Sequence, residues 1–221
     1  MLFLKKLTPD MEIAAIRKEY TLKSLDLQEV EDSPLEQFRI WWDEALKAQV
    51  LEANAMNVST LNAEHKPSSR IVLLKGLDHG FVFYTNYESR KGKEIENFPY
   101  VALTFFWPEL ERQVRVEGKV EKTNPETSDE YFLSRPISSQ IGAWASPQSQ
   151  IIPDRTYLEN REKEFILKFS QDSLVRPQHW GGYRVVPTYL EFWQGRASRL
   201  HDRIVYEKEN MDSWTKKRLA P

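Results

Sequence analysis

The sequence predicts a mainly β fold with peripheral helices, in which antiparallel strands form a barrel or a sandwich. Short runs rich in β-branched and aromatic residues follow one another from residue 55 to about residue 123, separated by turn-forming residues. Their close spacing favours antiparallel pairing, because parallel strands need long crossover connections. Seven Trp, nine Tyr and eleven Phe supply apolar area for one substantial core, so residues 33–221 are expected to form a single domain.

The N-terminal part of the chain predicts a polar segment followed by a helix. Residues 1–32 are irregular in pattern, with a short helix expected around Met11 to Tyr20. The first clear helix begins at "SPLEQFRIWWDEAL", where Ser33 can cap, Pro34 suits the first helical position, and Glu36 completes a capping box. The residues expected on its apolar face are Leu35, Phe38, Trp42, Ala45 and Leu46.

The rest of the chain predicts strands, then helices, then strands. The strands expected first are "AMNVSTLN", "SSRIVLLKGL", "GFVFYTN", "YVALTFFW" and "RQVRVEGKVEKT". In the last of these, Val114, Val116 and Val120 share one face and charged residues share the other. Two helices follow, "NPETSDEYFLSRP" capped by Asn124 and "PDRTYLENREKEFILKF" capped by Asp154. The segments "GGYRVVPTYLEFW" and "RIVYEKE" are then predicted as strands.

Composition excludes several classes of function. Lys and Arg number 31 and Asp and Glu 33, so no global positive field attracts nucleic acid or an anionic membrane. The absence of cysteine excludes disulfides and thiolate catalysis, and it fits the cytoplasmic location that we expect. No apolar run approaches the roughly 18 residues of a membrane span, and the run before Lys5 is too short for a signal peptide.

The motifs of several common sites are also missing. The chain has no GxGxxG dinucleotide motif, no Walker-type phosphate loop and no GxSxG nucleophile elbow. Its four histidines show no metal-ligand spacing, so no metal is expected.

The segment "YTNYESRKGKEIENF" predicts a short helix that begins near Ser89. Arg90, Lys91 and Lys93 then fall in its first turn, where the helix dipole favours anions rather than cations. Backbone N–H groups, a hydroxyl and basic side chains at a helix start together favour a phosphate site. The alternative is a solvated basic turn, and the segment alone leaves both interpretations open.

Two further segments carry cations suited to phosphate. In "SSRIVLLK", Arg70 and Lys75 bracket a short strand expected to be buried; alternation points them to opposite faces, which suits two separate anions. The alternative is that both side chains extend to water. In "DEYFLSRPISS", Tyr131 and Arg135 lie four residues apart on one helical face, with serine hydroxyls just beyond. This group could hold a phosphate ester, or it could be an ordinary surface contact.

The segment "EFWQGRASRLHDR" concentrates planar polar side chains near the C-terminus. If the chain stays extended after Trp193, then Arg199, His201 and Arg203 all project to one side. Guanidinium and imidazole groups suit a flat, anionic, aromatic ligand through stacking and hydrogen bonds.

These segments together resemble the pyridoxamine 5′-phosphate oxidase family. The similar stretches are "PSSRIVLLKG", "YTNYESRKG", "FFWPELERQVRVEG", "YFLSRPISSQIGAWAS" followed by "PQSQ", "LEFWQGRASRLHDR" and the terminal "RLAP". They occur in the family's order and spacing from about Arg17 to Pro221. Many motifs in register make the resemblance more specific than any one of them.

The resemblance implies a split-barrel fold and a homodimer with FMN at the subunit interface. It implies oxidation of pyridoxine 5′-phosphate and pyridoxamine 5′-phosphate to pyridoxal 5′-phosphate, with O2 as the acceptor and H2O2 as a product. Three alternatives stay open. They are a related split-barrel flavoprotein with another substrate, a non-catalytic protein that binds FMN or pyridoxal phosphate, and a nucleic-acid-binding barrel, against which the near-zero net charge and the scattered basic residues weigh.

The resemblance also implies roles for particular residues. FMN contacts are expected from Arg70, Ile71, Val72, Leu73, Leu74, Lys75, Tyr84, Thr85, Ser89, Arg90, Lys91, Gln113, Gln148, Ser149, Trp193 and Arg203. Substrate contacts are expected from Arg17, Tyr20, Lys75, Tyr131, Arg135, Ser139, Arg199, Leu200 and His201. Within this set, Arg199 and His201 would carry the catalytic roles over the pyridine ring, and Arg17 with Tyr20 would form a mobile lid.

Overall fold

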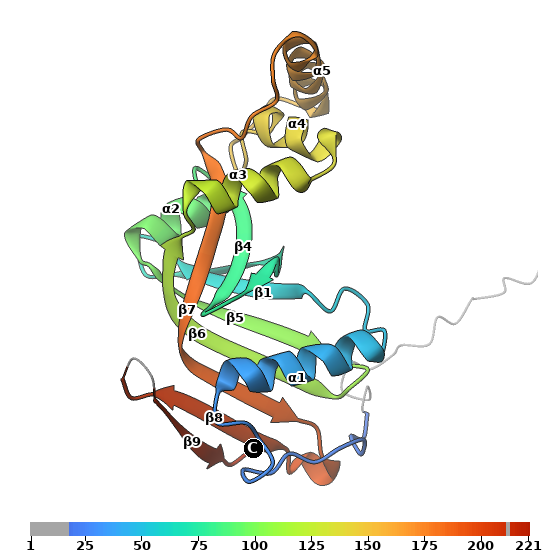
Figure 1. The fold of residues 1–221 in the computed structure, drawn as a ribbon, viewed down its shortest axis with the longest axis vertical. Helices are drawn as coiled ribbons and strands as arrows, with labels where there is room; N and C mark the ends of the chain where they lie inside the picture. Colours follow the sequence, from blue (N-terminus) through green and yellow to red (C-terminus); the bar gives the residue numbers. More distant parts are fainter. Residues whose placement is uncertain (1–17, 211–212) are drawn as a thin grey trace, which may run out of the picture.

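The fold is built on one sheet that curls into a half-barrel flanked by helices (Figure 1). The computed structural model describes residues 18–210 and 213–221. The strands are β1 (Ala55–Leu61), β2 (Pro67–Leu73), β3 (Gly76–Leu77), β4 (Phe81–Asn86), β5 (Tyr100–Trp107), β6 (Arg112–Lys122), β7 (Trp180–Gln194), β8 (Asp202–Lys208) and β9 (Trp214–Leu219). They pair antiparallel in the order β2-β1-β5-β6-β7-β4-β3, and β8 and β9 extend the sheet from β7. The predicted mainly β, antiparallel fold class is confirmed.

Local capping sets where the helices begin. The helices in the described part of the chain are α1 (Pro34–Lys47), α2 (Arg90–Asn97), α3 (Pro125–Ser134), α4 (Ile137–Ala145), α5 (Arg155–Gln171) and the 3₁₀ turn η2 (Ala197–Arg199). Side-chain oxygens of Ser33, Asn124 and Asp154 each accept a backbone hydrogen bond from the first turn, as predicted. None of these helices is both long and apolar enough to cross a membrane.

Helix α1 covers the sheet through aromatic contacts. The ring of Phe38 lies 4.9 Å from the ring of Phe81, and Phe38, Trp41 and Ala45 are all buried. The prediction that Leu46 belongs to this face is wrong, because its side chain is 52% exposed. Leu46 lies one residue beyond Ala45, which turns it about 100° away from the core.

Most predicted strands and helices are confirmed, but α4 and β9 were missed. In β6, Val114, Val116 and Val120 are buried as the alternation predicts. Helix α4 begins just after Pro136, where the predicted helix ended, and no second helix was expected there. Strand β9, which begins at Trp214, buries no residue, so it lacks the apolar alternation that marks a strand.

Strand β2 stands at the edge of the sheet, with β1 as its neighbour. The prediction that its apolar residues form a buried element is wrong, because Ile71 is 65% exposed. Leu74, which follows the strand, packs into the core instead. β2 has one edge without a paired strand, and Ile71 lies on a face that no other described element buries.

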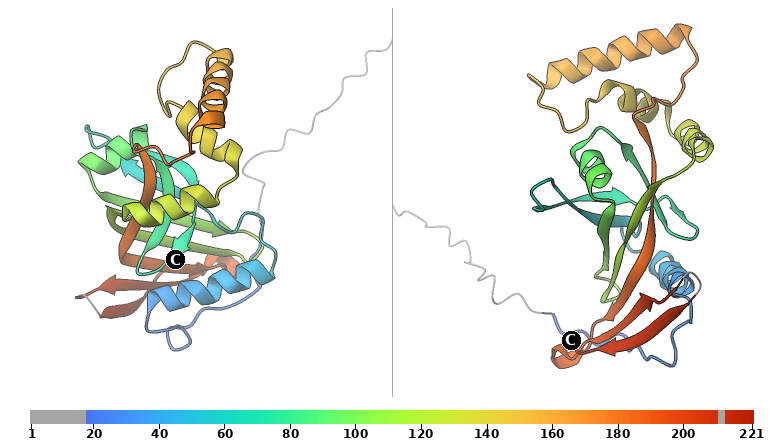
Figure 2. Two further views of the ribbon diagram at one scale, coloured as in Figure 1. Left: turned by 45° about the horizontal axis from the view of Figure 1, so that its top comes forward. Right: turned by 90° about the vertical axis from the view of Figure 1, so that its left-hand side faces the viewer.

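Strand β7 connects the two ends of the molecule. It runs over 15 residues, from Trp180 beside the α3–α4 end to Gln194 beside the β8–β9 end (Figures 1 and 2). Its pairing with β6 shifts register between Glu117 and Gly118, opposite Pro187. Such a bulge lets a long strand bend, and it accommodates a proline that cannot donate to the ladder.

Candidate functional site

Several of the predicted motifs line one cavity, which we call the basic cavity. It has a volume of about 540 Å³. Its lining includes the predicted cofactor residues Arg70, Ile71, Val72, Leu73, Lys75, Tyr84, Thr85, Lys91 and Gln148. It also includes the predicted substrate residues Tyr131, Arg135 and Ser139, together with Pro136 and Trp180. Side chains from β2, β4, α3 and α4 therefore converge on a space large enough for a small ligand.

The position of Lys75 corrects one prediction. Arg70 and Lys75 were expected to point to opposite faces, but both line the basic cavity. Strand β2 ends at Leu73, so the alternation of the strand does not extend to Lys75. The backbone of Lys75 instead turns to donate a hydrogen bond to the carbonyl oxygen of Val82.

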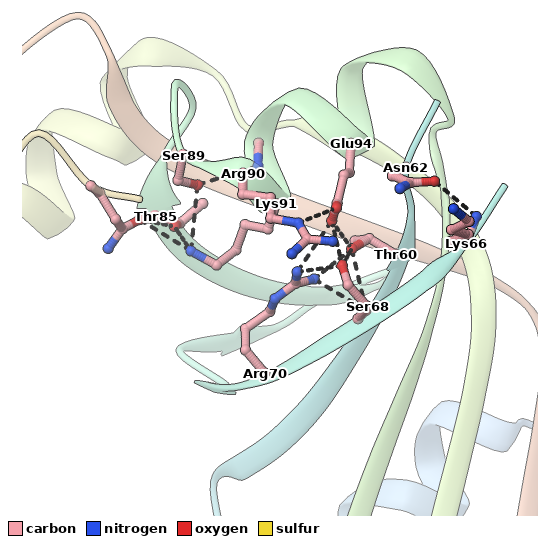
Figure 3. A network of polar contacts seen from close by, with 12 residues as sticks. Thr60, Asn62, Lys66, Ser68, Arg70, Thr85, Ser89, Arg90, Lys91 and Glu94 are labelled. Carbon is pink, nitrogen blue, oxygen red and sulfur yellow. Dashed lines mark hydrogen bonds and ion pairs between the residues drawn. The ribbon is translucent and has the colours of Figure 1, made fainter. Parts of the chain in front are cut away.

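The start of α2 brings a lysine to the cavity wall (Figure 3). Ser89 is the buried N-cap, as predicted. The Nζ atom of Lys91 lies 2.9 Å from Oγ1 of Thr85 and 3.1 Å from Oε1 of Gln148. Burial, together with the positive charge of Arg70, lowers the pKa of Lys91 to about 8. A bound anion would offset both causes, so this position suits one.

A buried glutamate, which the sequence analysis missed, ties two of the predicted arginines together. Glu94 accepts hydrogen bonds from Nη2 of Arg70 at 3.1 Å and from Nε of Arg90 at 2.8 Å (Figure 3). The four-residue spacing of Arg90 and Glu94 on a helix was a signal for one of these contacts. The contact with Arg70 crosses from α2 to β2, and nothing local in the sequence indicates it.

The α3–α4 wall of the cavity combines stacked rings with a half-buried arginine. The ring of Tyr84 lies 3.9 Å from that of Tyr131 and 5.5 Å from that of Trp180, and Arg135 lies 4.6 Å from the ring of Trp180. Burial lowers the pKa of Arg135. Its Nη1 atom is buried and has no hydrogen-bond partner among the described residues. A buried guanidinium without a partner is costly, so an anionic ligand would satisfy it.

A second cavity, the η2 cavity, lies around the C-terminal motif. It has a volume of about 880 Å³ and is lined by Lys18, Glu19, Tyr20, Arg196, Ser198, Arg199 and His201. The ring of His201 lies 4.5 Å from the ring of Trp193, and the ring of Tyr20 meets both edge-on at 5.9 Å and 5.7 Å. The predicted substrate residues Tyr20, Arg199 and His201 are thus brought together.

The hydrogen bonding of His201 fixes its protonation. Its Nδ1 atom accepts a hydrogen bond from the backbone N–H of Arg196 at 3.1 Å. Burial and the charge of Arg199 lower the pKa of His201. The imidazole is therefore neutral at pH 7 with its proton on Nε2, and it can donate a hydrogen bond to a ligand.

The chain does not stay extended after Trp193, so the condition for Arg199, His201 and Arg203 to share one side is not met. The turn η2 interrupts it, with left-handed φ values of 57° at Ser198 and 61° at Arg199. Arg199 and His201 still share the η2 cavity, but Arg203 does not line it. Nε and Nη2 of Arg203 each lie 2.9 Å from a carboxylate oxygen of Glu191, so its guanidinium is held along the sheet.

The remaining predicted residues fall outside both cavity linings. The side chain of Leu74 is buried in the core. Ser149 follows Gln148 and is exposed, with a φ of 68°. Gln113 lies opposite Trp193 in the β6–β7 ladder, and Leu200 is exposed beside the η2 cavity.

The two groups of predicted residues do not meet within one chain. Trp180, in the basic cavity, is the first residue of β7, whereas Trp193 is next to its last. The two cavities share no lining residue. Helices α3 and α4, whose residues line the basic cavity, lie at the opposite end of β7 from β8, which follows η2 in the chain (Figure 1). In the described ranges, no group of His, Cys, Asp or Glu is arranged to hold a metal ion.

The segment that carries Tyr20 is held by a buried carboxylate. Oε2 of Glu111 accepts hydrogen bonds from the backbone N–H groups of Thr21 at 2.8 Å and Leu22 at 3.1 Å. This contact places Tyr20 at the η2 cavity. Arg17, the other predicted lid residue, and most of the helix expected around residues 11–20 lie outside the described residues.

The sequence matches two known family descriptions. Residues 42–167 match "Pyridoxamine 5′-phosphate oxidase", and residues 180–221 match "Pyridoxine 5′-phosphate oxidase C-terminal dimerisation region". A protein of Leptospira interrogans named pyridoxine/pyridoxamine 5′-phosphate oxidase is 56% identical over 213 residues, which cover 96% of this chain and 100% of that protein. A protein of the same name from Cytophaga hutchinsonii is 56% identical over 211 residues, which cover 95% of this chain and 98% of its own length.

Solved structures give the same picture of the fold. PhzG from Burkholderia lata 383, in complex with tetrahydrophenazine-1-carboxylic acid, is 26% identical, with a TM-score of 0.84 over 91% of this chain and all of that one. A pyridoxamine 5′-phosphate oxidase-related, FMN-binding protein from Nostoc punctiforme is 14% identical, with a TM-score of 0.69 over 87% of this chain and all of that one, and it supports the fold alone. Identity above half over nearly the whole length shows that this chain belongs to the pyridoxamine 5′-phosphate oxidase family.

Proposed function

We propose that this protein is an FMN-dependent oxidase that converts pyridoxine 5′-phosphate and pyridoxamine 5′-phosphate to pyridoxal 5′-phosphate. The alcohol substrate loses two hydrogen atoms and O2 becomes H2O2; the amine substrate also takes up water and releases ammonia. The observation that carries this proposal is the buried, unpartnered guanidinium nitrogen of Arg135, in a cavity that holds a second basic cluster. Two phosphate esters, one on the cofactor and one on the substrate, would account for the two sets of basic residues.

The charged residues at and beside the α2 end of the basic cavity fit the phosphate of FMN. Arg70 and Lys91 line the cavity, whereas Arg90 lies next to Lys91 outside the lining. Arg70, Arg90 and Lys91 carry three positive charges and Glu94 carries one negative charge, which leaves a net charge of two. A phosphate monoester carries roughly −1.5 to −2 charges at neutral pH, so the charges match. Bound FMN would supply the redox chemistry, and the protein would supply binding and orientation.

The α3–α4 wall fits the phosphate of the substrate. Arg135 offers a buried N–H donor, Tyr131 and Ser139 offer hydroxyls, and Lys75 adds a second charge. Charge-assisted hydrogen bonds of this kind are the strong ones, and a phosphate held far from the reacting carbon fixes the orientation of the ring.

A homodimer would join the two cavities into complete sites. The match of residues 180–221 to a dimerisation region supports assembly. Exposed apolar side chains on the outer face of the sheet, including Ile71 and Phe106, provide a surface for it. We propose that the η2 cavity of one protomer closes the basic cavity of its partner, with FMN between them.

The η2 residues would then act on the substrate ring. Neutral His201 would donate a hydrogen bond from Nε2, and the guanidinium of Arg199 would stabilise negative charge at the reacting end. Neither group needs to change its charge at pH 7 to do so.

The structure of the related protein PhzG supports one alternative. Its structure contains a carboxylic acid rather than a phosphate ester, so a family member with a different substrate is the second candidate. The cluster of Lys75, Tyr131, Arg135 and Ser139 favours the phosphate substrate here.

The absence of cysteine also supports our proposal of a cytoplasmic location.

The decisive experiment follows both products in aerated buffer. FMN-loaded protein is mixed with pyridoxine 5′-phosphate, and pyridoxal 5′-phosphate and peroxide are measured together. We expect equal amounts of both, and almost none from unphosphorylated pyridoxine. A flavin-loaded protein that forms neither product from the alcohol or the amine substrate would contradict this substrate assignment.

The affinity for FMN is expected to fall as the pH rises above about 8. The pKa of Lys91 in the free protein is lowered to about 8, and a bound phosphate would raise it. Charged Lys91 therefore contributes fully below pH 8, and above it the affinity should fall by up to about tenfold per pH unit. Flavin-fluorescence titrations at pH values from about 6.5 to about 9.5, which bracket this pKa, measure the dissociation constant of FMN. Lys91→Arg should remove the dependence; an equal fall in that variant would assign it to another group.

A further inference from the structure

We infer that Glu94 is a positioning residue for the FMN phosphate, because it holds Arg70 and Arg90 in the geometry that binds the anion. The inference deepens the proposed function and rests on it. Glu94 does not line the basic cavity, and its role would be exerted through the two arginines.

The carboxylate of Glu94 is the centre of the network in Figure 3. Its Oε2 atom accepts hydrogen bonds from Oγ1 of Thr60 at 2.5 Å, Oγ of Ser68 at 2.8 Å and Nη2 of Arg70 at 3.1 Å. Its Oε1 atom accepts from Nε of Arg90 at 2.8 Å. The side chain is buried, so these partners replace water completely.

This network keeps Glu94 ionised. Burial by itself raises the pKa of Glu94, but the hydrogen bonds from Thr60, Ser68, Arg90 and Arg70 together lower it to about 2. The carboxylate therefore stays charged across the pH range in which the protein works, and its grip on both arginines does not vary with pH.

Arg90 is outside the lining of the basic cavity and its side chain is 60% exposed, so its terminal donors are open to an anion beside Lys91. Glu94 engages Arg90 through Nε, and among the described residues no contact involves either terminal nitrogen of Arg90. These two nitrogens form the planar fork that binds phosphate oxygens in pairs. Arg70 is held more tightly, through both terminal nitrogens, so its charge is fixed beside the cavity.

Glu94 also joins the two structural elements that carry these cations. Thr60, Ser68 and Arg70 belong to the β1–β2 hairpin, whereas Arg90 and Lys91 belong to α2. A phosphate contacted from both sides requires a fixed separation between hairpin and helix. One carboxylate that bonds to both sets this separation before the ligand arrives, which lowers the entropy lost on binding.

Charge and position make opposite predictions for the loss of this carboxylate. Removing the negative charge leaves three cations beside the phosphate, which by electrostatics alone would strengthen FMN binding. Removing the hydrogen bonds releases Arg70 and Arg90, which would weaken it. The sign of the change therefore distinguishes a positioning residue from a counter-charge.

The test compares FMN with riboflavin, which lacks the phosphate, on the full-length protein freed of flavin. Dissociation constants are measured by flavin-fluorescence titration for the unchanged protein, for Glu94→Gln, and for Glu96→Gln as the matched control. Glu96 lies on the same helix and is exposed, so its substitution changes the charge of α2 equally without touching the network. We expect Glu94→Gln to bind FMN about 10-fold more weakly or worse, with riboflavin affinity and Glu96→Gln unchanged.

Each outcome decides the matter. FMN binding that is unchanged or tighter in Glu94→Gln would overturn the inference, and so would an equal loss for FMN and riboflavin, which indicates a general folding role. An unchanged protein with no preference for FMN over riboflavin would overturn the proposed FMN site itself and this inference with it. If Glu94→Gln does not fold, Glu94→Asp takes its place: it keeps the charge but shortens the reach, and FMN affinity equal to that of the unchanged protein would contradict us.

Discussion

Replacing Arg199 with alanine is expected to lower turnover about 100- to 1,000-fold while the protein keeps its FMN. Arg199 lines the η2 cavity beside His201, whereas the cluster proposed for the FMN phosphate lies at the other end of the chain. The substitution therefore removes a planar cation from the proposed ring site and leaves the phosphate contacts of the cofactor intact. The measurements are kcat with pyridoxine 5′-phosphate and the flavin absorbance of the purified variant.

The same variant carries a second, independent signature. Arg199 is one of the causes that lower the pKa of His201, so its removal should move that pKa upward, toward the ordinary value. The acidic limb of the pH profile should then shift to higher pH. Arg199→Lys is the control, because it keeps the charge but lacks the planar fork; it should retain the pH profile and lose part of the turnover. Loss of flavin from Arg199→Ala would refute the assignment to the ring.

Replacing Arg135 with alanine is expected to raise the KM for pyridoxine 5′-phosphate by about 30-fold or more. The reason is its buried Nη1 donor, which has no partner in the described part of the chain and would be satisfied by the substrate phosphate. The effect on kcat at saturating substrate should be smaller. Steady-state kinetics with substrate over a wide concentration range separates the two parameters.

Stability provides a further check on Arg135. A buried guanidinium that lacks a full set of partners costs folding energy, so Arg135→Ala should melt at the same temperature as the unchanged protein, or higher. Arg155→Ala, at the exposed start of α5, is the control for both measurements and should change neither. An unchanged KM in Arg135→Ala would argue against the phosphate role. A marked loss of stability would indicate that the arginine supports the fold instead.

Local chemistry made much of this fold predictable. Helices α1, α3 and α5 begin where Ser33, Asn124 and Asp154 can cap them, because a cap depends on residues only three positions apart. The strands from β1 to β6 follow from alternation and turn residues. Helix α4 and strand β9 could not be predicted in this way, since α4 begins after Pro136 with no side-chain cap and β9 has no buried face.

The candidate site was predictable only in its charged residues. The cations of the basic cavity stand in recognisable motifs, but their partners come from distant parts of the chain. Glu94 bonds to Arg70, which lies 24 positions earlier in the chain. The ring of Trp180, at the start of β7, stacks on the ring of Tyr84 in β4. Contacts of this kind depend on how strands and helices pack together. They therefore cannot be predicted from the periodic pattern of residues along the sequence. The left-handed turn at Ser198 and Arg199 was missed because neither residue is a glycine.

The length of β7 has a genetic consequence. Its 15 residues, each advancing about 3.3 Å, hold the two cavities on the order of 45 Å apart along the strand. Under the proposed dimer, each site takes its phosphate wall from one chain and its arginine and histidine from the other. A chain damaged at Arg135 and a chain damaged at Arg199 would then form a hybrid in which one site carries both lesions and the other carries none. Two inactive alleles of this gene should therefore complement each other in one cell.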